Sequence, residues 1–593
     1  MDKNLDNIRH SLAHLLAASV LKQFPDAKLG IGPTIEEGFY YDFLLPRTLK
    51  PEDLKGFEKD MKKMIFAGLP FSGRKVTPAE AKKIFSSKGG SVSGGKDQPF
   101  KLELIKDLVK EKKSLTVYKT GDIFLDLCRG GHVKNTKEIN VDAFKLDRIA
   151  GAYWRGDEKN EQLQRIYGLA FSTKKELEDY LKMREEAEKR DHKKLGPKLD
   201  LFTFSDLVGA GLPLWTPKGT IIRNELDNFV WNLRKAQGFE KVEIPHIAKK
   251  DLFEKSGHWE KFRDDMFQIT TREKHTFAMK PMNCPHHTQI YNRRKWSYKE
   301  LPQKYANTTM VYRDEQSGEL AGLARVRSIT QDDAHVFCRQ SQIEEELMKV
   351  WNIVEEFYGA VGFKLDVRLS LHDPKEMKKY LGTSANWKKA ESQLRSVVKK
   401  RGAEVIEEIG EAAFYGPKID FMAKDSIGRE WQVATIQLDM NLPERFDLTC
   451  VNEKGKDERI IMIHAAIMGA IERYMAILIE HFAGAFPVWL SPVQVEVMNV
   501  GAGQLKYAKE IYDTLKKEGL RVKLNDENLT VGKKIREAEI QKVPYVLVVG
   551  EKEEKAKTVN VRNRSTTQIG EIKLVKIIER LKEEIDKKTL PEF

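Results

Sequence analysis

The stretch that decides the fold is MVYRDEQSGELAGLARVRSITQDDAHVFC, residues 310–338. It predicts two strands joined by a loop that contains Gly318 and Gly322, with alternate residues of each strand projecting to one face of a sheet. The loop and its flanks carry Arg313, Glu315, Arg325 and Arg327. Arginine on such a face can hold a phosphate through its bidentate fork. A solvated hairpin is the alternative for this stretch taken alone.

Two further segments bear on the same site. GAIERY (469–474) places Arg473 on a helix behind a Gly469–Ala470 pair, which leaves room for a ligand to approach. GFEKVEIPHI (238–247) predicts a strand, KVEIP, that ends at Pro245 after a helix. Further strands are expected in FYGPKIDFMA and GREWQVATIQLD, and a helix in AIMGAIERYMAILIEHFAG. Strands separated by long irregular insertions predict an antiparallel sheet that carries a site.

Length and composition limit the classes of protein. A chain of 593 residues is too long for one hydrophobic core, so several domains are expected. The net charge of +13 favours a polyanionic partner, with solubility alone as an equal alternative. Four cysteines are too few for a disulfide scaffold of this length, which favours a reducing compartment, the cytoplasm. The sequence contains neither a signal-peptide pattern nor an apolar run long enough to span a membrane.

The chain is expected to be an α+β protein of several domains. Residues 1–172 mix short strands and helices and include a Gly/Ser-rich loop at 86–99. Residues 173–198 predict one long exposed helix that ends at Gly196–Pro197. Residues 199–486 form the largest domain, and residues 487–593 alternate strand and helix, which predicts a small α/β domain.

The three segments around residues 240, 310–338 and 469–474 resemble motifs 1, 2 and 3 of the class II aminoacyl-tRNA synthetases. The resemblance implies an antiparallel-sheet catalytic domain, a homodimer formed through motif 1, and ATP bound with Mg²⁺. It assigns Arg313 and Arg473 to the phosphates and Glu315 to the adenine amino group. Arg325 and Lys418 complete the catalytic set that it implies.

MNCPHH (282–287), DDAHVF (332–337) and IHAAIMGAIERY (463–474) are similar to segments of the threonyl branch of that family. A lone Cys or His is more often a core or surface residue than a ligand, and the spacing of these three residues alone identifies no zinc site. The resemblance implies that Cys284, His335 and His464 bind one Zn²⁺ per subunit. Zinc with an open position suits the amino and hydroxyl groups of L-threonine, and Asp333 matches the acceptor for that hydroxyl.

The same resemblance assigns further residues to the pocket for threonine and its adenylate: Met282, Gln331, Tyr415, Gln432 and Gln437. Two positions depart from the family pattern. Ile329 stands where an aromatic residue usually stacks on adenine, and Ala470 stands where serine is common. Neither departure removes a charge or a metal ligand, so they affect ATP affinity rather than the class of reaction.

RHSLAHLLA (9–17) places His10 and His14 on one face of a helix, and LDLCRGGHV (125–133) supplies a second group of polar residues: Asp126, Cys128 and His132. By residue type alone, the set suggests either a second zinc site or half-buried histidines. It resembles the editing domain of bacterial-type threonyl-tRNA synthetases, which hydrolyses seryl-tRNA, and Lys101 matches a basic residue there. A second hydrolytic site answers a physical need, because one methyl group distinguishes threonine from serine by only about 1–3 kcal/mol.

NDENLTVGKKIREAEIQKVPYVLVVGEKE and VNVRNR resemble the anticodon-binding domain of several class II synthetases. Asn528, Glu553 and Arg562 match positions that contact anticodon bases of tRNA(Thr). Lys533, Lys534 and Arg536 lie in the first turns of a predicted helix and suit phosphates, with a solvated basic face as the alternative. The chain begins at the editing domain, and the small ubiquitin-like domain of many members is not expected in it.

Two other classes of protein are alternatives to the full synthetase. A binding-only paralogue does not need the phosphate-binding arginines and metal ligands together. A stand-alone hydrolase of mischarged tRNA does not need the activation block. ATP–pyrophosphate exchange with threonine separates all three.

Overall fold

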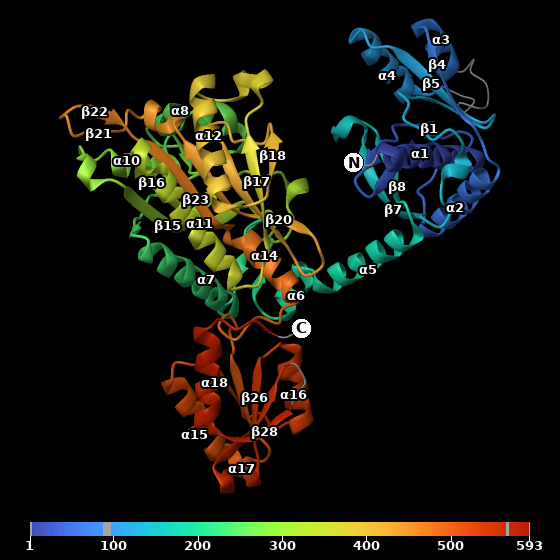
Figure 1. Cartoon of the computed structure of the whole chain (residues 1–593). Coiled ribbons are helices and arrows are strands. Elements are labelled where there is room, and N and C mark those ends of the chain that lie inside the picture. The colour runs from blue at the N-terminus through green and yellow to red at the C-terminus, as the bar shows by residue number, and fades with distance from the viewer. Residues whose placement is uncertain (1–2, 87–96, 565–567, 592–593) are drawn as a thin grey trace. The chain divides into compact units, whose positions relative to one another are not determined.

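The computed structural model describes residues 3–86, 97–564 and 568–591 and divides into two compact units, Met1–Glu185 and Glu186–Phe593. Figure 1 shows the course of the chain. Most of the Gly/Ser-rich loop at 86–99 lies outside the described residues. Within the described residues, no helix combines the length and the apolar character needed to cross a bilayer.

The N-terminal unit contains two sheets with their own helices. The larger sheet has the order β1-β3-β8-β7, with β2 on β3, and α1 and α2 pack against it around a core that includes Tyr41 and Phe57. The smaller sheet has the order β4-β5-β6 and is covered by α3 and α4. The helices are α1 (Lys3–Gln23), α2 (Pro51–Phe66), α3 (Pro78–Phe85) and α4 (Pro99–Lys110). The strands are β1 (Lys28–Leu29), β2 (Thr34–Ile35), β3 (Gly38–Leu44), β4 (Phe71–Val76), β5 (Leu115–Thr120), β6 (Phe124–Leu127), β7 (Phe144–Tyr153) and β8 (Gln162–Ala170).

The single long helix expected over residues 173–198 is wrong. The segment forms α5 (Lys174–Arg190) and α6 (His192–Lys198). Asp191 breaks the first helix because its backbone is non-helical (φ −50°, ψ 118°), and its carboxylate accepts from the Lys193 N–H at 2.9 Å as the cap of α6. Pro197 lies inside α6 rather than after a helix end.

The second unit is built on an eight-stranded sheet with the order β11-β15-β16-β23-β20-β19-β17-β18, antiparallel except for its two outermost pairs. The strands are β11 (Glu240–Lys241), β15 (Gln303–Tyr312), β16 (Ser328–Cys338), β17 (Leu365–Leu371), β18 (Val405–Ile409), β19 (Lys418–Lys424), β20 (Glu430–Asp439) and β23 (Ile461–Ala470). The helices that share its core are α7 (Pro217–Ala236), α11 (Ile343–Gly359), α12 (Ser384–Arg401) and α14 (Ile471–His481). The two strands and the loop expected in residues 310–338 are confirmed as β15, β16 and their connection.

Smaller elements surround this sheet. They are β9 (Phe202–Thr203), β10 (Leu214–Trp215), β12 (Ile247–Lys249), α8 (Lys250–Ser256), α9 (His258–Phe262), β13 (Gln268–Thr270), β14 (Thr276–Met279), α10 (Cys284–Tyr291), α13 (Asn441–Arg445), β21 (Thr449–Val451) and β22 (Asp457–Arg459). Two expectations need correction. The strand KVEIP extends only to Lys241, and the helix expected from Ala466 begins at Ile471, because the preceding residues belong to β23.

The C-terminal part forms a five-stranded sheet with the order β25-β24-β26-β27-β28, parallel at its first three strands and antiparallel at the rest. Its elements are β24 (Val495–Asn499), α15 (Leu505–Lys517), β25 (Val522–Asn525), α16 (Val531–Ile540), β26 (Tyr545–Val549), α17 (Glu551–Ala556), β27 (Thr558–Asn563), β28 (Gln568–Lys573) and α18 (Leu574–Asp586). The alternation of strand and helix predicted here is confirmed.

Candidate functional site

A cavity of about 340 Å³ lies on the eight-stranded sheet and is lined mainly by β16, β20 and β23. It collects most of the predicted residues of the largest domain. The predicted residues that line it are Met282, Cys284, Arg313, Gln331, Asp333, His335, Tyr415, Gln432, Gln437, His464 and Arg473. Ile329 and Ala470, the two departures from the family pattern, line it as well.

Strand alternation explains how β16 contributes to the cavity. Gln331, Asp333 and His335 occupy alternate positions and all line it. Asp332, between them, is fully buried and forms an ion pair with Arg234. Its Oδ2 also accepts from the backbone N–H groups of Ile467 and Met468, each at 2.9 Å.

Those two contacts fix an irregularity in β23. His335 pairs with His464 and Ala334 with Ala465, but Asp332 pairs with Gly469, so residues 466–468 stand opposite a single residue of β16. The extra residues form a β-bulge, a feature that re-aims side chains next to functional sites. Neither the role of Asp332 nor the bulge could be predicted from the sequence, because only the pairing register reveals them.

Cys284, His335 and His464 form a group able to hold a metal ion. One ligand atom from each lies within 4.8 Å of the others, and all three side chains are buried. Cys284 begins α10, whereas the two histidines face each other across β16 and β23. Sulfur and imidazole nitrogen are the ligands that zinc prefers.

The outer nitrogens of both histidines have partners. His464 Nε2 lies 3.0 Å from Asp439 Oδ2, and His335 Nδ1 lies 2.7 Å from His287 Nδ1. Such contacts fix ring orientation and tautomer, so His464 keeps its Nδ1 lone pair for a cation. His335 Nε2 and His464 Nδ1 are 3.1 Å apart. Burial raises the pKa of the Cys284 thiol, a cost that a bound cation offsets by stabilising the thiolate.

Three predicted catalytic residues do not line the cavity: Glu315, Arg325 and Lys418. Arg325 is paired with Glu315 at 2.6 Å and with Glu319 at 3.2 Å, so Glu315 and Arg325 neutralise each other. Lys418 forms an ion pair with Asp420. Asp420 also accepts from Gln432 Nε2 at 2.7 Å, and so joins Lys418 to a residue of the cavity wall.

A second cluster lies in the N-terminal unit. Cys128 Sγ is 3.4 Å from His10 Nε2 and 3.2 Å from His132 Nε2, and the His14 ring packs against His132 at 4.3 Å. Gly130 and Gly131 have φ values of +97° and +88°, a conformation that favours glycine, and they turn the chain so that His132 returns to Cys128. The predicted set His10, His14, Cys128 and His132 therefore comes together, and these residues could also hold a metal ion.

Lys101 and Asp126 form a buried ion pair at 2.6 Å in the same unit. Tyr41 donates from its hydroxyl to Asp126 at 2.5 Å and accepts from Lys101 Nζ at 3.0 Å. Tyr41 was missed by the sequence analysis, since nothing around it distinguishes it from a core aromatic residue. Burial raises the pKa of the Cys128 thiol to about 12.

The comparisons with known proteins follow the same division of the chain. Residues 267–482 match the class II core domain of the tRNA synthetases for G, H, P, S and T, and residues 494–584 match an anticodon-binding domain. Residues 115–167 match the second additional domain of threonyl- and alanyl-tRNA synthetases.

Similar curated proteins extend over nearly the whole chain. A threonine–tRNA ligase of Flavobacterium johnsoniae is 45% identical over 98% of this chain and 89% of its own length. One of Gloeobacter violaceus is 46% identical over 99% of this chain and 93% of its own. The chain belongs to the threonine–tRNA ligase family.

Solved structures agree with membership of the threonine–tRNA ligase family. A structure titled as the RNA-binding domain of threonyl-tRNA synthetase from Cryptosporidium parvum matches with a TM-score of 0.64 and 38% identity, over 68% of this chain and 99% of that chain. A threonyl-tRNA synthetase described as putative, from Aeropyrum pernix, matches with a TM-score of 0.60 and 30% identity, over 68% of this chain and 98% of that chain.

In this member of the threonine–tRNA ligase family, the predicted anticodon residues are spread over the C-terminal sheet. Asn528 follows β25 and Glu553 lies in α17 after β26, so both follow strands that end at one edge of the sheet. Arg562 lies on β27 and pairs with Val546, near the start of β26. Glu553 accepts from the Gly550 N–H at 2.9 Å, which occupies one of its carboxylate oxygens.

The expectation that Lys534 serves phosphates is wrong. Its side chain is buried, and its Nζ donates to the backbone carbonyls of Asn499 and Asn525 at 3.2 and 3.1 Å. Lys534 therefore ties α16 to the ends of β24 and β25. The helix alone did not reveal this, because burial depends on which face packs against the sheet.

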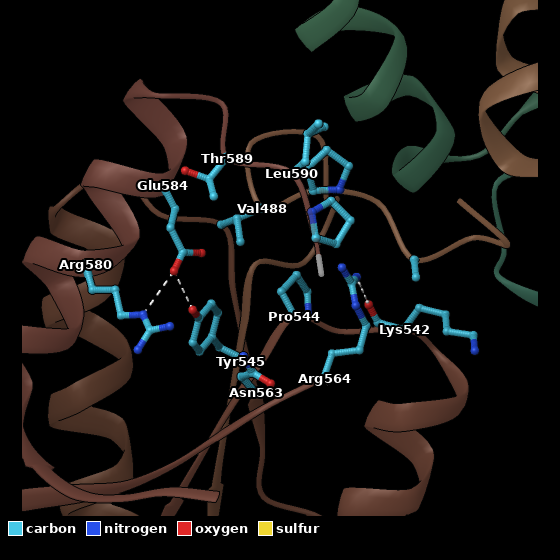
Figure 2. A pocket seen from close by; sticks show the side chains of 13 residues that line it. Val488, Lys542, Pro544, Tyr545, Asn563, Arg564, Arg580, Glu584, Thr589 and Leu590 are labelled. Atoms are coloured by element: carbon cyan, nitrogen blue, oxygen red, sulfur yellow. Dashed lines mark hydrogen bonds and ion pairs between the residues drawn. The ribbon is translucent and has the colours of Figure 1, made fainter. Parts of the chain in front are cut away.

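A second cavity, of about 280 Å³, lies beside α18 and the start of β26, where the chain enters the C-terminal domain (Figure 2). Glu584 accepts from Tyr545 at 2.6 Å and from Arg580 at 3.0 Å, while Arg564 donates to the carbonyls of Phe486 and Lys542 at 2.8 and 2.9 Å. These contacts fasten α18 and the end of β27. None of the predicted site residues is among the described residues that line it.

Proposed function

We propose that this chain attaches L-threonine to tRNA(Thr) in two steps, at the cost of ATP. The observation that carries the proposal is the cavity on the eight-stranded sheet, where two arginines and the Cys284–His335–His464 group line one space. A binding-only relative has no use for both sets in one cavity. A stand-alone hydrolase has no use for either.

We propose that Cys284, His335 and His464 hold one zinc ion. The chemistry of the donors fits, and the partners of the outer nitrogens fit as well. When bound, zinc supplies a Lewis-acidic position that is open to an amino group and a hydroxyl. Asp333 has one oxygen engaged by Asn283 Nδ2 at 3.1 Å, which leaves its other oxygen to accept the threonine hydroxyl. Valine, lacking that hydroxyl, would leave polar groups unpaired and be rejected.

In the first step the threonine carboxylate oxygen attacks the α-phosphorus of ATP. A phosphorus–oxygen bond forms to give the adenylate, and the bond to pyrophosphate breaks. Arg313 and Arg473 line the same cavity and would bind the phosphates, with Mg²⁺ accompanying ATP. Burial lowers the pKa of both guanidinium groups, which shows the cost of holding their charge in the cavity. Bound phosphate would offset that cost.

The remaining residues of the cavity would orient the amino acid and its adenylate: Met282, Gln331, Tyr415, Gln432 and Gln437. Glu315 and Arg325 would exchange their mutual ion pair for contacts with the nucleotide. Asp420 would hold Lys418 near the cavity wall. In the second step a tRNA ribose hydroxyl attacks the threonyl carbonyl and AMP leaves. Catalysis then rests on positioning and charge stabilisation.

We propose a second activity in the N-terminal unit, the hydrolysis of seryl-tRNA(Thr). The supporting observation is that His10, His14, Cys128 and His132 converge close to the buried pair Lys101–Asp126. Burial lowers the pKa of the His14 imidazole, so this ring stays neutral and can accept a hydrogen bond from the attacking water. The ester bond breaks between the seryl carbonyl and the ribose oxygen, and water supplies the hydroxyl.

We propose that Asn528, Glu553 and Arg562 contact the anticodon.

We also propose that two copies of the chain form a homodimer. Support for the dimer comes from large apolar side chains left exposed in and around the connection between β9 and β10. They are Phe204, Leu207, Val208 and Leu214, and Leu207 is 99% exposed. Exposed apolar groups gathered in one segment are typical of an interface.

The central test is ATP–pyrophosphate exchange with threonine, serine and valine in turn. Exchange should be strong with threonine, measurable with serine and lowest with valine. Absence of threonine-dependent exchange in protein that retains its metal would contradict the synthetase assignment. Equal exchange with valine would contradict the assignment of the metal and Asp333 to the hydroxyl.

A further inference from the structure

One peptide segment in the loop between β15 and β16 is held from two sides. The backbone N–H of Leu323 donates to His192 Nε2 at 3.0 Å. The carbonyl of the next residue, Ala324, accepts from Arg473 Nε at 3.0 Å. Leu323 itself is fully buried in the core of the second unit. The loop that carries Glu315 and Arg325 is therefore anchored at its return to β16.

The contact with Leu323 fixes the tautomer of the His192 ring. Since Nε2 accepts, the ring proton must reside on Nδ1, which donates to Glu480 Oε1 at 2.6 Å. The same oxygen accepts from the His192 backbone N–H at 3.2 Å. His192 is 5% exposed and Glu480 7% exposed. Both ring nitrogens are occupied, so the group Asp191–His192–Glu480 offers no imidazole lone pair to a metal ion, although its atoms lie close enough for one.

Glu480 is held as an anion. Burial alone would raise the pKa of Glu480, but the hydrogen bond from His192 and the charge of Arg429 outweigh it, and the pKa lies below its ordinary value. Arg429 forms an ion pair with the second oxygen of Glu480. A carboxylate that stays ionised keeps the proton on His192 Nδ1 and the lone pair on Nε2.

Helix α14 therefore holds the loop twice. Arg473 and Glu480 are two helical turns apart on it, so they share a face. Arg473 reaches the loop directly, whereas Glu480 acts through His192. Gly322 completes the fit, because its φ is +55° and a Cβ there would lie 2.4 Å from His192 Nε2. Any side chain at residue 322 would displace the imidazole.

We infer that His192 is a positioning residue for ATP: it anchors the loop between β15 and β16, from which Glu315 and Arg325 would turn to the nucleotide. This inference rests on the proposed function, in which that loop binds ATP. His192 begins α6, one residue after the break at Asp191, so the break between the two helices is what brings the imidazole to the loop.

The inference predicts an effect confined to the nucleotide. The residues assigned to threonine lie mainly on β16, β20 and β23 and line the cavity without a contact from His192. Loss of the Leu323 contact should raise the KM for ATP roughly three- to tenfold, the worth of one hydrogen bond. The KM for threonine and the zinc content should stay within about twofold of the wild type, because ground-state binding of the amino acid is untouched.

Two variants separate the two ring nitrogens. A glutamine side chain can place an acceptor oxygen near the position of Nε2, whereas an asparagine reaches only the position of Nδ1. His192→Gln should keep the Leu323 contact and a nearly normal ATP KM. His192→Asn should keep the contact with Glu480 but release Leu323, and should show the full rise.

His372 provides a matched control. Its Nδ1 and its backbone N–H donate to one oxygen of Glu391, at 2.5 and 3.0 Å, and both residues are buried, as in the His192–Glu480 pair. His372 does not line the cavity. His372→Asn should lower the melting temperature about as much as His192→Asn and leave the ATP KM unchanged.

The experiment makes two measurements on the full-length wild type and on these three variants. One is the kinetics of ATP–pyrophosphate exchange, and the other is the amide hydrogen exchange of residues 313–328. We expect faster exchange of the Leu323 amide and a raised ATP KM in His192→Asn alone. A normal ATP KM in His192→Asn, or an equal rise in His372→Asn, overturns the inference. A wild type without threonine-dependent exchange refutes the proposed function instead, and the hydrogen exchange of Leu323 then still decides whether His192 holds the loop.

Discussion

His464 lies with its Nε2 3.0 Å from Asp439 Oδ2, across the neighbouring strands β23 and β20. The other oxygen of Asp439 accepts from the backbone N–H groups of Asn441 and Leu442, at 2.7 and 2.9 Å. The carboxylate is thus fixed before any metal binds, and it turns the imidazole so that Nδ1 faces Cys284 and His335.

Replacement of this carboxylate should weaken metal binding without removing a ligand. Asp439→Asn keeps the backbone contacts but loses the anionic partner of His464, and zinc affinity should fall by about 10- to 100-fold. Competition with a chelator measures the change. Cys284→Ala should lose zinc and exchange activity outright, whereas Cys338→Ala, a buried cysteine outside the site, should keep both. Full zinc affinity in Asp439→Asn would refute the orienting role.

The editing proposal predicts a separation of activities. His14→Ala and Cys128→Ala should activate threonine normally and accumulate seryl-tRNA. Tyr41→Phe removes the hydroxyl that contacts both members of the Lys101–Asp126 pair, and seryl-tRNA hydrolysis should slow by about tenfold, the worth of roughly 1.4 kcal/mol. Deacylation of purified seryl-tRNA is the measurement. Unchanged seryl-tRNA hydrolysis in both His14→Ala and Cys128→Ala would contradict the assignment of this cluster to editing.

Ile329 offers a gain-of-affinity test. It pairs with Val311 across β15 and β16 and lines the cavity, where an aromatic ring would stack on adenine. Stacking on a base is worth roughly 1–3 kcal/mol, of which isoleucine supplies a part. Ile329→Phe should lower the ATP KM by up to about tenfold with a nearly unchanged kcat. An unchanged or higher ATP KM would mean that the neighbouring side chains leave no room for a ring.

The anticodon assignment predicts an effect on tRNA alone. Arg562→Ala and Glu553→Ala should raise the KM for tRNA and leave adenylate formation unaltered. Lys534→Met is the contrasting change, because this buried lysine joins three backbone and side-chain acceptors and its loss should lower the melting temperature. A loss of adenylate formation in Arg562→Ala equal to the loss in tRNA use would argue against a purely RNA-binding role.

Lys280 gives a prediction for pH. It is fully buried, its Nζ donates to Thr309 at 3.0 Å, and burial lowers its pKa to about 8. The fold therefore disfavours the charged form of Lys280. Burying that charge costs folding stability, and the full cost applies below about pH 8. The cost declines as the pH rises towards the ordinary value for lysine, about 10.4. Lys280→Met should be more stable than the wild type at pH 7, and the difference in melting temperature should shrink by pH 9.5.

Lys304→Met is the control for that comparison. Lys304 is also buried but forms an ion pair with Glu346, so its removal leaves this buried carboxylate with Lys349 alone and should destabilise the chain at both pH values. A constant difference between Lys280→Met and the wild type across this pH range would show that Lys280 titrates normally in the fold.

Much of the fold followed from local patterns, because strands such as β15, β16 and β24 carry their periodicity in the sequence. The break between α5 and α6 did not, since its charge pattern continues through Asp191 and only the capping contact interrupts the helix. The same limit applies to the site. Ligand types and motif arginines are visible in the sequence, but Asp439, Tyr41 and His192 act through partners distant in the chain.

The bulge at residues 466–468 has a consequence for how the site can be altered. His335 and His464 pair on one side of it, and Gln331 and Ala470 pair on the other. The metal ligands and the helix that bears Arg473 thus follow two separate registers of one strand pair, and the two hydrogen bonds to Asp332 span the change of register. Shortening the bulge by one residue would shift the nucleotide half by one position and leave the metal half aligned. The length of the bulge therefore sets where Arg473 lies relative to the metal ligands.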